Sequence, residues 1–412
     1  MINNISKRRI SESKELFIVA FLLVNSLSWW FFERQNIYVI YEEAIASLSQ
    51  KVIVFGVQDL LIICSGIIGA FLSDRMKKLS ILSLWMILGV FSSILMCLLP
   101  YLSLAHSILI TFFCAISFGI GMPSCLGYFA DLTTFENRAS TAGLVFFIAS
   151  AITPLTIMIS ISSTMLSLLA ALIWRGIGLS MLGLLKKTSK DVTEKEKSRA
   201  FTLILTDKKF LLYLFPWFMF SLIYGFQKVI LEKAISADLY ALLRVIQSIF
   251  GTSSAIISGP LCDKVGRKPV VIYGFVSLGI AYAAVSMAPN SLLALYFYSV
   301  IDGVSWGIFM VIFVLVLWGD LSSITLNSKE KYYAIGGIPF FLAEFTGFIL
   351  KPHLQISVNA AFSIASFFLF LAVIPLMYAP ETLPEKLIRR RELKEYVEKA
   401  KKIREKYERK ND

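Results

Sequence analysis

Long apolar segments recur along the whole chain, and they constrain its fold more than any other feature of the sequence. These runs reach about 18 residues or more, enough for a helix to cross a hydrocarbon core of roughly 30 Å. Of the 412 residues, 57% are hydrophobic and 17% are charged, whereas soluble proteins average about 25% charged residues. The composition therefore indicates a protein whose outer surface faces lipid.

The apolar pattern predicts an all-α membrane protein with twelve transmembrane helices. They fall at residues 15–39, 52–73, 79–99, 105–130, 140–161, 164–185, 210–232, 238–262, 269–288, 291–319, 332–351 and 358–379. The first is expected to be a spanning helix and not a cleaved signal, because its apolar stretch is long and no A-x-A site follows it. The chain then divides into an N-terminal six-helix half (1–185), a cytoplasmic linker (186–209), a C-terminal six-helix half (210–379) and a cytoplasmic tail (380–412).

An internal duplication relates the two halves. Asp74 lies in a charged turn, and Asp263 lies in a similar turn 263 − 74 = 189 residues later. The other pairs at this offset are Gln58 with Gln247 (247 − 58 = 189) and Asp131 with Asp320 (320 − 131 = 189). A fixed offset over nearly half the chain predicts two pseudo-symmetric halves, as in many transport proteins.

Basic residues in the short loops predict the orientation. One side carries the linker, the tail and Lys7, Arg8, Arg9, Arg75, Lys77, Lys78, Arg138, Lys264, Arg267 and Lys268. The opposite loops hold little beyond Lys51, Lys233 and Lys351. Both termini are therefore expected to be cytoplasmic, in a multi-pass protein of the cell membrane. The net charge of +12 follows from this distribution and does not indicate nucleic-acid binding.

The sequence offers little for enzymatic or metal chemistry. Its five cysteines lie in or at the ends of apolar helices without a CxxC pair, so we interpret them as reduced packing residues. The two histidines, His106 and His353, fall in predicted extracellular loops. The G-x-x-x-x-G-K-[ST], H-E-x-x-H and G-x-S-x-G motifs do not occur. We expect no cofactor, no metal site and no enzymatic activity.

The tail after the last span is strongly charged. Its apolar residues recur at a spacing of three to four, which predicts an amphipathic helix over 385–410; they are Leu393, Tyr396, Ala400, Ile403 and Tyr407. One interpretation is a solvated helix with one face against the bundle or the headgroups. The other is a helix that senses lipid or binds a partner.

The charged turns resemble a motif of the major facilitator superfamily, G-x-x-x-D-[RK]-x-G-[RK]-[RK], found between helices 2 and 3 and repeated between helices 8 and 9. The segment from Gly259 to Lys268 matches in full. The first copy departs from it, with Ala70, Lys77 and Leu79 in place of both glycines and the last basic residue. The resemblance covers the whole chain and implies the twelve-helix fold of that superfamily.

Two further segments carry the same resemblance. Asp131, Glu136 and Arg138 follow the acidic-x-x-x-x-E-x-R pattern that family members show after helix 4. Residues 380–382 read Pro-Glu-Thr, like the turn after helix 12 of sugar and metabolite porters. The P-E-S turn after helix 6 and the helix-5 motif of drug antiporters are missing, so the subfamily stays open.

The resemblance implies that the charged turns gate the cytoplasmic face. Asp74 would face the start of helix 11 and Asp263 the start of helix 5, where each carboxylate could accept hydrogen bonds at a helix N-terminus. The predicted gating residues are Asp74, Arg75, Lys78, Asp131, Glu136, Arg138, Asp263, Arg267, Lys268 and Asp320. The alternative is that these charges only set the topology.

Several ionisable residues fall inside the predicted spans, where they are costly and tend to face a cavity or a partner. The resemblance puts helices 1, 4, 7 and 10 around a central cavity, flanked by helices 2, 5, 8 and 11. The predicted proton carriers on these helices are Asp59, Asp302, Glu344 and Glu33. The alternative for Glu33 is a simple ion pair with Arg34 at the outer surface. Lys228 and Arg175 are interpreted as snorkelling and structural, respectively.

Aromatic and amide side chains on helices 1, 7 and 10 could form a binding surface, since tryptophan and tyrosine stack on sugars and organic rings. The predicted substrate-binding residues are Arg34, Trp30, Arg244, Gln227 and Trp306. For each aromatic side chain, packing or lipid contact is the alternative.

These observations predict a monomeric secondary active transporter that moves a small organic solute by alternating access, coupled to protons. A sugar or a carboxylate-bearing metabolite is the favoured substrate class. The alternatives are an efflux pump for drugs or metabolites, and a receptor of the same fold that binds solute without moving it.

Overall fold

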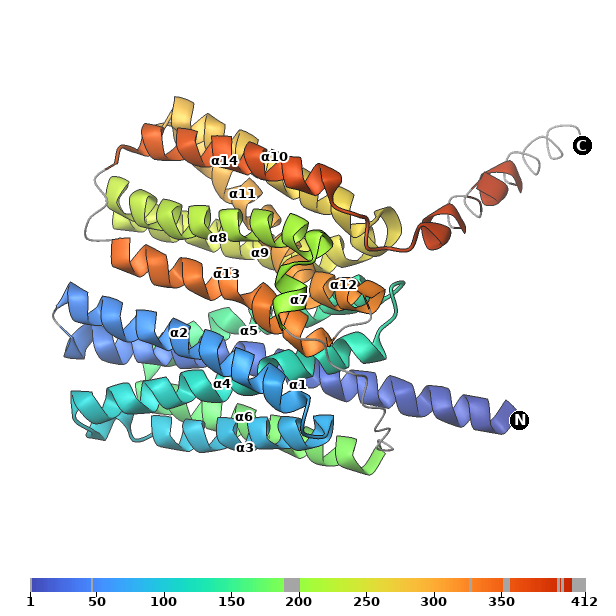
Figure 1. Cartoon of the computed structure of the whole chain (residues 1–412). Helices are drawn as coiled ribbons and strands as arrows, with labels where there is room; N and C mark the ends of the chain where they lie inside the picture. The colour runs from blue at the N-terminus through green and yellow to red at the C-terminus, as the bar shows by residue number, and fades with distance from the viewer. Residues whose placement is uncertain are drawn as a thin grey trace, which may run out of the picture.

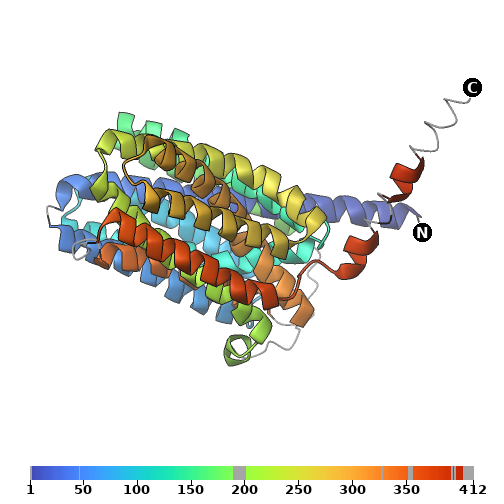
Figure 2. The ribbon, with the colours of Figure 1, turned by 90° about the horizontal axis from the view of Figure 1, so that it is seen from above.

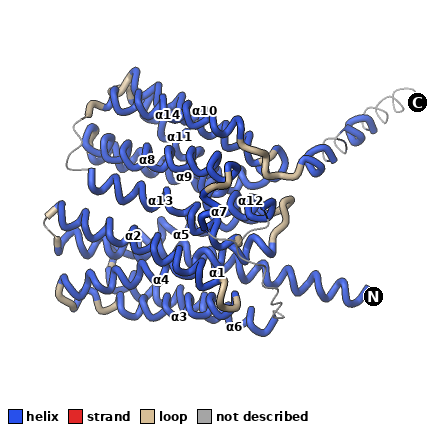
Figure 3. The backbone as a smooth tube through the Cα atoms, in the orientation of Figure 1, coloured by secondary structure: helices blue, strands red, loops and turns tan. Residues whose placement is uncertain are grey.

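The computed structural model describes residues 2–45, 47–188, 201–325, 328–350, 356–390, 393 and 396–401. All secondary structure within these ranges is helical (Figure 3). The first half contains α1 (Ile2–Ala44), α2 (Leu48–Ser73), α3 (Lys78–Met96), a 3-10 turn (Leu99–Tyr101), α4 (Leu104–Leu132), α5 (Arg138–Ser162) and α6 (Thr164–Thr188). The short helix α7 (Phe201–Leu205) precedes the second half.

The second half contains α8 (Lys208–Ala234), α9 (Ala237–Val265), α10 (Arg267–Met287), α11 (Leu292–Phe309), α12 (Leu317–Thr325), α13 (Lys329–Leu350) and α14 (Val358–Tyr378). A π-helical segment, Met310–Val316, joins α11 to α12 without a break, so the predicted span at 291–319 extends to Thr325. Within the described ranges, eleven helical stretches are long and apolar enough to cross a membrane. All twelve predicted spans coincide with helices, so the all-α membrane fold is confirmed.

The helices form two groups that lie side by side (Figure 1). In that view α2, α3, α4 and α6 occupy the lower part, α8, α10, α11 and α14 the upper part, and α13 lies between them. Contacts between the groups follow the duplication, because α2 packs along α13 and α5 packs along α9. The start of α1 and the described part of the tail lie at the same end of the bundle (Figure 2). We call this the terminal end; the sequence predicts that it is cytoplasmic.

The outer surface of the bundle is apolar. Ile173, Ile257 and Phe367 are more than 60% exposed, at 64%, 67% and 62%, on three different helices. Many other large apolar side chains on the described helices are exposed as well, and apolar exposure on this scale is rare on soluble monomers. It is the surface expected of helices that contact lipid, and the chain is a multi-pass membrane protein.

Short polar turns end and begin the helices. Ser236, Ser291 and Ser357 precede α9, α11 and α14, and each hydroxyl accepts an N–H of the first turn, which satisfies a donor that the helix itself leaves unpaired. The turn between α9 and α10 is a single residue, Gly266, with φ of 113°. Only glycine adopts this conformation without strain.

The tail is helical at 385–390 and 396–401, which agrees with the start of the predicted helix; residues 402–412 lie outside the described part.

Candidate functional site

A cavity lies between the two halves. It contains about 820 Å³ of space not filled by atoms, a figure that includes space open to the surroundings. Its walls come from α1, α2, α4 and α5 on one side and from α8, the π-helical segment, α12 and α13 on the other. None of the described residues in the lining carries a charge. Its aromatic residues are Trp30, Phe31, Phe118, Phe146, Trp217, Phe313, Trp318, Tyr333, Phe340 and Phe341.

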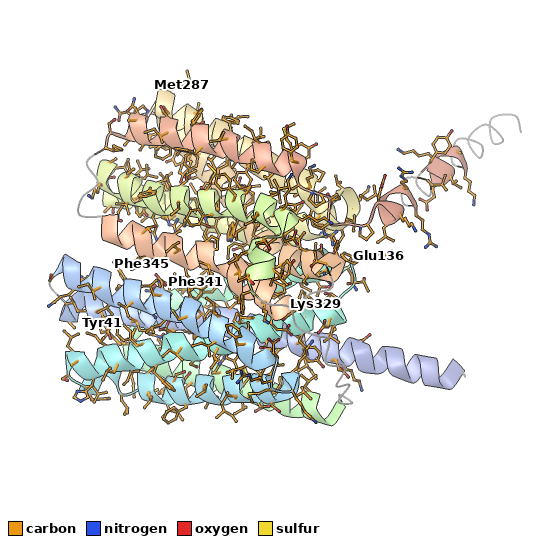
Figure 4. All side chains as sticks on the ribbon, in the orientation of Figure 1. Tyr41, Glu136, Met287, Lys329, Phe341 and Phe345 are labelled. Atoms are coloured by element: carbon orange, nitrogen blue, oxygen red, sulfur yellow. The ribbon has the colours of Figure 1, made fainter. Side chains whose placement is uncertain are left out.

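Aromatic rings contact one another across the two halves at this cavity. Trp30 of α1 stacks on Phe118 at a centroid distance of 5.6 Å and meets Phe341 of α13 edge-on at 5.9 Å. Figure 4 labels Phe341 and Phe345, which lie on α13 where it runs beside α2. The Trp217 indole donates to the Gly336 carbonyl at 3.0 Å. The N–H groups of Trp30 and Trp318 have no acceptor among the described residues.

A first polar cluster lies next to the cavity, between α1 and α2. Arg34 Nη1 lies 3.0 Å from an Asp59 carboxylate oxygen and donates to Gln58 Oε1 at 2.8 Å. The Gln58 amide donates in turn to Glu33 at 2.6 Å. The Arg34 guanidinium lies 5.8 Å from the Trp30 ring. Glu33 is therefore buried and bonded to Gln58, and it is not part of a simple pair with Arg34 at the outer surface.

A second polar cluster occupies the other half. Arg244 Nη1 donates to Tyr224 and to Gln247, both at 3.0 Å, and the Gln247 amide donates to Tyr298 at 3.2 Å. Asp302 is 1% exposed in the same half, and its Oδ1 has no hydrogen-bond donor in the described structure. Gln58 and Gln247 thus make equivalent hydrogen bonds in the two halves, since each accepts from an arginine and donates to a neighbouring oxygen.

At the terminal end, the second charged turn bonds directly to the first half. The Asp263 carboxylate accepts from Ala139 N at 3.2 Å, Ser140 N at 2.7 Å and the Ser140 hydroxyl at 2.5 Å, at the N-terminus of α5. This contact needs Gly259, because a Cβ there would lie 2.4 Å from the Ala139 carbonyl oxygen. Arg267 Nη2 adds a bond to the Phe135 carbonyl at 2.6 Å.

Asp320 is the centre of the same contact. It is fully buried, accepts from Arg267 Nε at 3.0 Å within its own half, and pairs with Arg138 of the other half. The Thr382 hydroxyl reaches it at 3.3 Å. Asp320, Arg138 and Arg267 are each at most 3% exposed as side chains. Charge-assisted hydrogen bonds in such dry surroundings are the strong ones.

The Pro-Glu-Thr turn completes this network. Glu381 accepts from the Arg267 and Lys268 backbone amides at 2.9 and 3.0 Å, and so caps α10. Its carboxylate lies against Gly266, where a Cβ would come within 2.6 Å of it. The Tyr213 hydroxyl donates to the Pro380 carbonyl at 2.7 Å. The turn was predicted only from its resemblance, and its role as a helix cap was not predicted.

The first charged turn repeats the arrangement with exposed groups. Asp131 pairs with Lys78 of its own half and with Lys329 at the start of α13, as Asp320 does with Arg267 and Arg138. Lys78 and Arg267 keep the offset of the duplication (267 − 78 = 189). The Lys78 and Asp131 side chains are 44% and 30% exposed, however, and surface pairs of this kind contribute little.

Asp74 lies across from the start of α13. Its carboxylate pairs there with the Lys331 ammonium at 2.8 Å.

Three predicted gating side chains lie outside these contacts. Arg75 and Glu136 are exposed, without an ion pair in the described part of the chain, and Figure 4 shows Glu136 on the terminal end. Lys268 donates to the Met377 carbonyl at 2.7 Å and pairs with none of the predicted acids in the described ranges.

Only one of the predicted substrate-binding residues, Trp30, lines the cavity. Arg34 and Trp306 contact residues that line the cavity. The Arg34 guanidinium lies over the Trp30 ring, and the Trp306 ring centroid lies 5.9 Å from that of Phe340. Arg244 and Gln227 are not part of the lining, and the Glu344 side chain lies outside the described residues. The sequence reasoning missed Phe340 and Phe341 of α13, for which no sequence signal separates a cavity position from a lipid-facing one.

Arg175 is buried within the first half. Its guanidinium lies 5.0 Å from the Trp29 ring and 4.9 Å from the Trp85 ring, and it donates to Asn25 at 3.2 Å and to Ser26. This placement fits the structural role expected for it. Among the described residues, no group of histidine, cysteine and acidic side chains is suited to hold a metal ion.

Comparison with known proteins identifies the fold. No protein-family model matches the chain, and no curated protein matches it in sequence. Among solved structures, the human organic anion transporter MFSD10 aligns with a TM-score of 0.68 at 14% identity, over 89% of this chain and 99% of that one. The proton:xylose symporter XylE aligns with a TM-score of 0.65 at 17% identity, over 90% and 97%.

A bacterial homologue of the iron transporter ferroportin aligns with a TM-score of 0.70 at 11% identity, over 89% of this chain and 98% of that one. Similarity at these identities establishes the fold, which is that of the major facilitator superfamily, as the charged turns predicted.

Proposed function

We propose that this protein is a secondary active transporter that moves a small organic solute through the membrane by alternating access. The observation that carries the proposal is the position of the cavity between two halves that are joined at the terminal end by the duplicated charge network. Such bonds can break and re-form as the halves rock. A receptor that only binds solute has no need of inter-half bonds in both copies of the turn.

The compared proteins are consistent with this proposal. MFSD10 is described as an organic anion transporter and XylE as a proton:xylose symporter. Both names refer to movement of small organic solutes on this fold. The substrates differ between them, so the solute of the present chain follows from its own cavity.

Proton coupling is part of the proposal, with Asp59, Asp302 and Glu33 as carriers. Each of these carboxylates is at most 1% exposed, and Asp59 faces an arginine that also borders the cavity. Burial disfavours the charged form of a carboxylate, and a nearby arginine favours it. Movement of Arg34 when solute binds would therefore switch Asp59 between its charged form, favoured beside the arginine, and its protonated form, favoured by burial alone. Glu344, also predicted as a carrier, completes the set on α13.

Alternating access is tested by measuring distances between spin labels across the halves. Cysteines replace Arg75 and Tyr378 at the terminal end in one protein, and Tyr101 and Leu293 at the opposite end in another, both without the native cysteines. All four positions are exposed. We expect two distance populations for each pair, shifting in opposite directions between the two ends. A single unchanging distance at both ends in every condition would contradict transport.

Coupling is tested with Asp59→Asn and Asp302→Asn in proteoliposomes. We expect each variant to lose gradient-driven uptake and to retain exchange, because exchange needs no net proton movement. Full uphill transport in both variants and in Glu344→Gln would show that the assigned carboxylates do not carry the proton.

A further inference from the structure

The cavity between the halves has the composition of an aromatic box. We infer that its ligand is a planar, uncharged aromatic compound, and not a sugar or a carboxylate. This inference rests on the proposed function, in that the transported solute is taken to occupy this cavity. It replaces the substrate class that the sequence favoured.

The lining excludes a polyhydroxylated ligand. Apart from indole N–H groups, the only polar side chain among the described residues of the wall is Tyr333, and its hydroxyl already donates to the Leu315 carbonyl at 2.7 Å. A sugar would bury several hydroxyls without partners. Each such hydroxyl weakens binding by about fivefold or more, so a sugar would gain too little from apolar contacts to compensate.

The lining also excludes a carboxylate. Arg34 is a cation beside the cavity: it lies over the Trp30 ring and is already held by Asp59 at 3.0 Å and by Gln58 at 2.8 Å. A second carboxylate would have to compete with Asp59 for this charge. The carboxylates of Glu33 and Asp59, both within the same cluster, would repel it.

The shape of the wall suits a flat ring system. Trp30 and Phe118 are stacked with an interplanar angle of 18°, and Trp217 and Phe313 with one of 12°. One parallel pair therefore belongs to each half. Phe341 meets Trp30 edge-on. Rings inserted in such a box gain offset-stacked and edge contacts beyond simple area burial.

The wall offers little hydrogen bonding to a polar ligand. The indole nitrogens of Trp30 and Trp318 are fully buried, without surface open to the cavity, and have no acceptor in the described structure. The Trp318 nitrogen lies against Gly336, where a Cβ would come within 2.3 Å of it. Phe313, on the π-helical segment, is a lining residue, and such segments recur at functional sites.

The test is equilibrium dialysis of the purified full chain in lipid nanodiscs, with protein-free nanodiscs subtracted. The probes are coumarin, coumarin-3-carboxylate and xylose, of which the first two share one ring system and differ by a charge. We expect coumarin to bind at least tenfold more tightly than either of the others. Equal or tighter binding of the carboxylate or of xylose, or no binding of coumarin, would overturn the inference.

Variants locate the binding to the cavity. Trp30→Ala and Phe341→Ala are each expected to weaken coumarin binding about tenfold. Phe367→Ala, a lipid-facing change at 62% exposure, is the matched control and should leave binding unchanged. If Trp30→Ala does not fold, Phe341→Ala and the probe ratios still decide the result; loss of binding in the control alone would place the ligand elsewhere and refute the site.

The spin-label pairs separate this inference from the proposed function. Coumarin that binds the cavity while each spin-label pair shows one unchanging distance in every condition would contradict transport and leave the ligand class intact. Distances that respond to xylose but not to coumarin would contradict the ligand class and leave transport intact.

Discussion

Replacement of Asp320 by asparagine tests the bond that joins the halves most directly. Asp320 is fully buried between Arg267 of its own half and Arg138 of the other. Asparagine keeps the shape of the side chain and removes the charge. Two buried arginines then lose their shared carboxylate, and breaking a buried pair of this kind costs about 3–5 kcal/mol of folding stability.

Part of this loss acts only on the closed terminal end, because Arg138 approaches Asp320 only while the halves are together. A hydrogen bond to a charged group contributes about 1.5–3 kcal/mol. If the Arg138 bond is lost, the ratio of closed to open terminal ends should fall roughly 10- to 140-fold. The matched variant is Asp131→Asn, at the equivalent position of the first half. The partially exposed ion pairs of Asp131 contribute about 0–1 kcal/mol each. Loss of its pair with Lys329, the one between the halves, should therefore change the ratio of closed to open terminal ends by less than about fivefold.

The assay is the distance distribution between spin labels at Arg75→Cys and Tyr378→Cys, which reports the populations of closed and open terminal ends. Thermal unfolding of the same proteins measures how much folding stability each substitution removes. Asp320→Asn should show a clear open population and a lower unfolding temperature than Asp131→Asn. The reasoning is refuted if the two variants give the same distributions, or if Asp320→Asn remains as closed as the unmodified chain.

Three further changes test individual contacts. Gly259→Ala forces a Cβ to within 2.4 Å of the Ala139 carbonyl oxygen. It should lower the folding stability by about 1–3 kcal/mol and lengthen the spin-label distances at the terminal end. The control Gly183→Ala, with no atom within 4 Å of the added Cβ, should do neither. Glu381→Gln removes the charge that caps α10 and should lower the unfolding free energy by about 0.5–2 kcal/mol, and an unchanged unfolding transition would exclude the cap. Arg175→Lys removes a guanidinium that lies over two tryptophan rings and should cost about 2 kcal/mol, measured by chemical unfolding; equal stability would mean that ring contact contributes nothing.

The twelve spans and the two-half arrangement were predictable because hydropathy and a repeated offset are properties of the sequence alone. The offset also pointed to Gln58 and Gln247, which make equivalent bonds in the two halves. It did not distinguish Asp131 from Asp320. The same residue type at equivalent positions is 30% exposed in one half and fully buried in the other, because burial depends on how closely the partner helices approach.

The composition of the cavity was not predictable for a different reason. An aromatic residue in a spanning helix satisfies hydropathy equally well against lipid, against another helix or beside a cavity. Phe367 is 62% exposed on α14, whereas Phe341 lines the cavity. The residues around them in the sequence do not predict which of the two faces lipid and which faces the cavity. The prediction of a polar binding site rested on charges. The structure places the charged side chains that it describes in clusters beside the cavity and not on its wall.

The cavity and the terminal-end network share their helices, and this gives the proposed transport cycle a physical link. Trp318 lines the cavity two residues before Asp320, and both belong to α12. α13 begins with Lys329, which pairs with Asp131, and continues to the cavity residue Phe341. The Tyr333 hydroxyl, bonded to the Leu315 carbonyl, holds α13 against the π-helical segment. A ligand that displaces the cavity walls therefore moves the same helices that carry the inter-half bonds, so binding energy in the cavity can act on the closed terminal end without any separate signalling path.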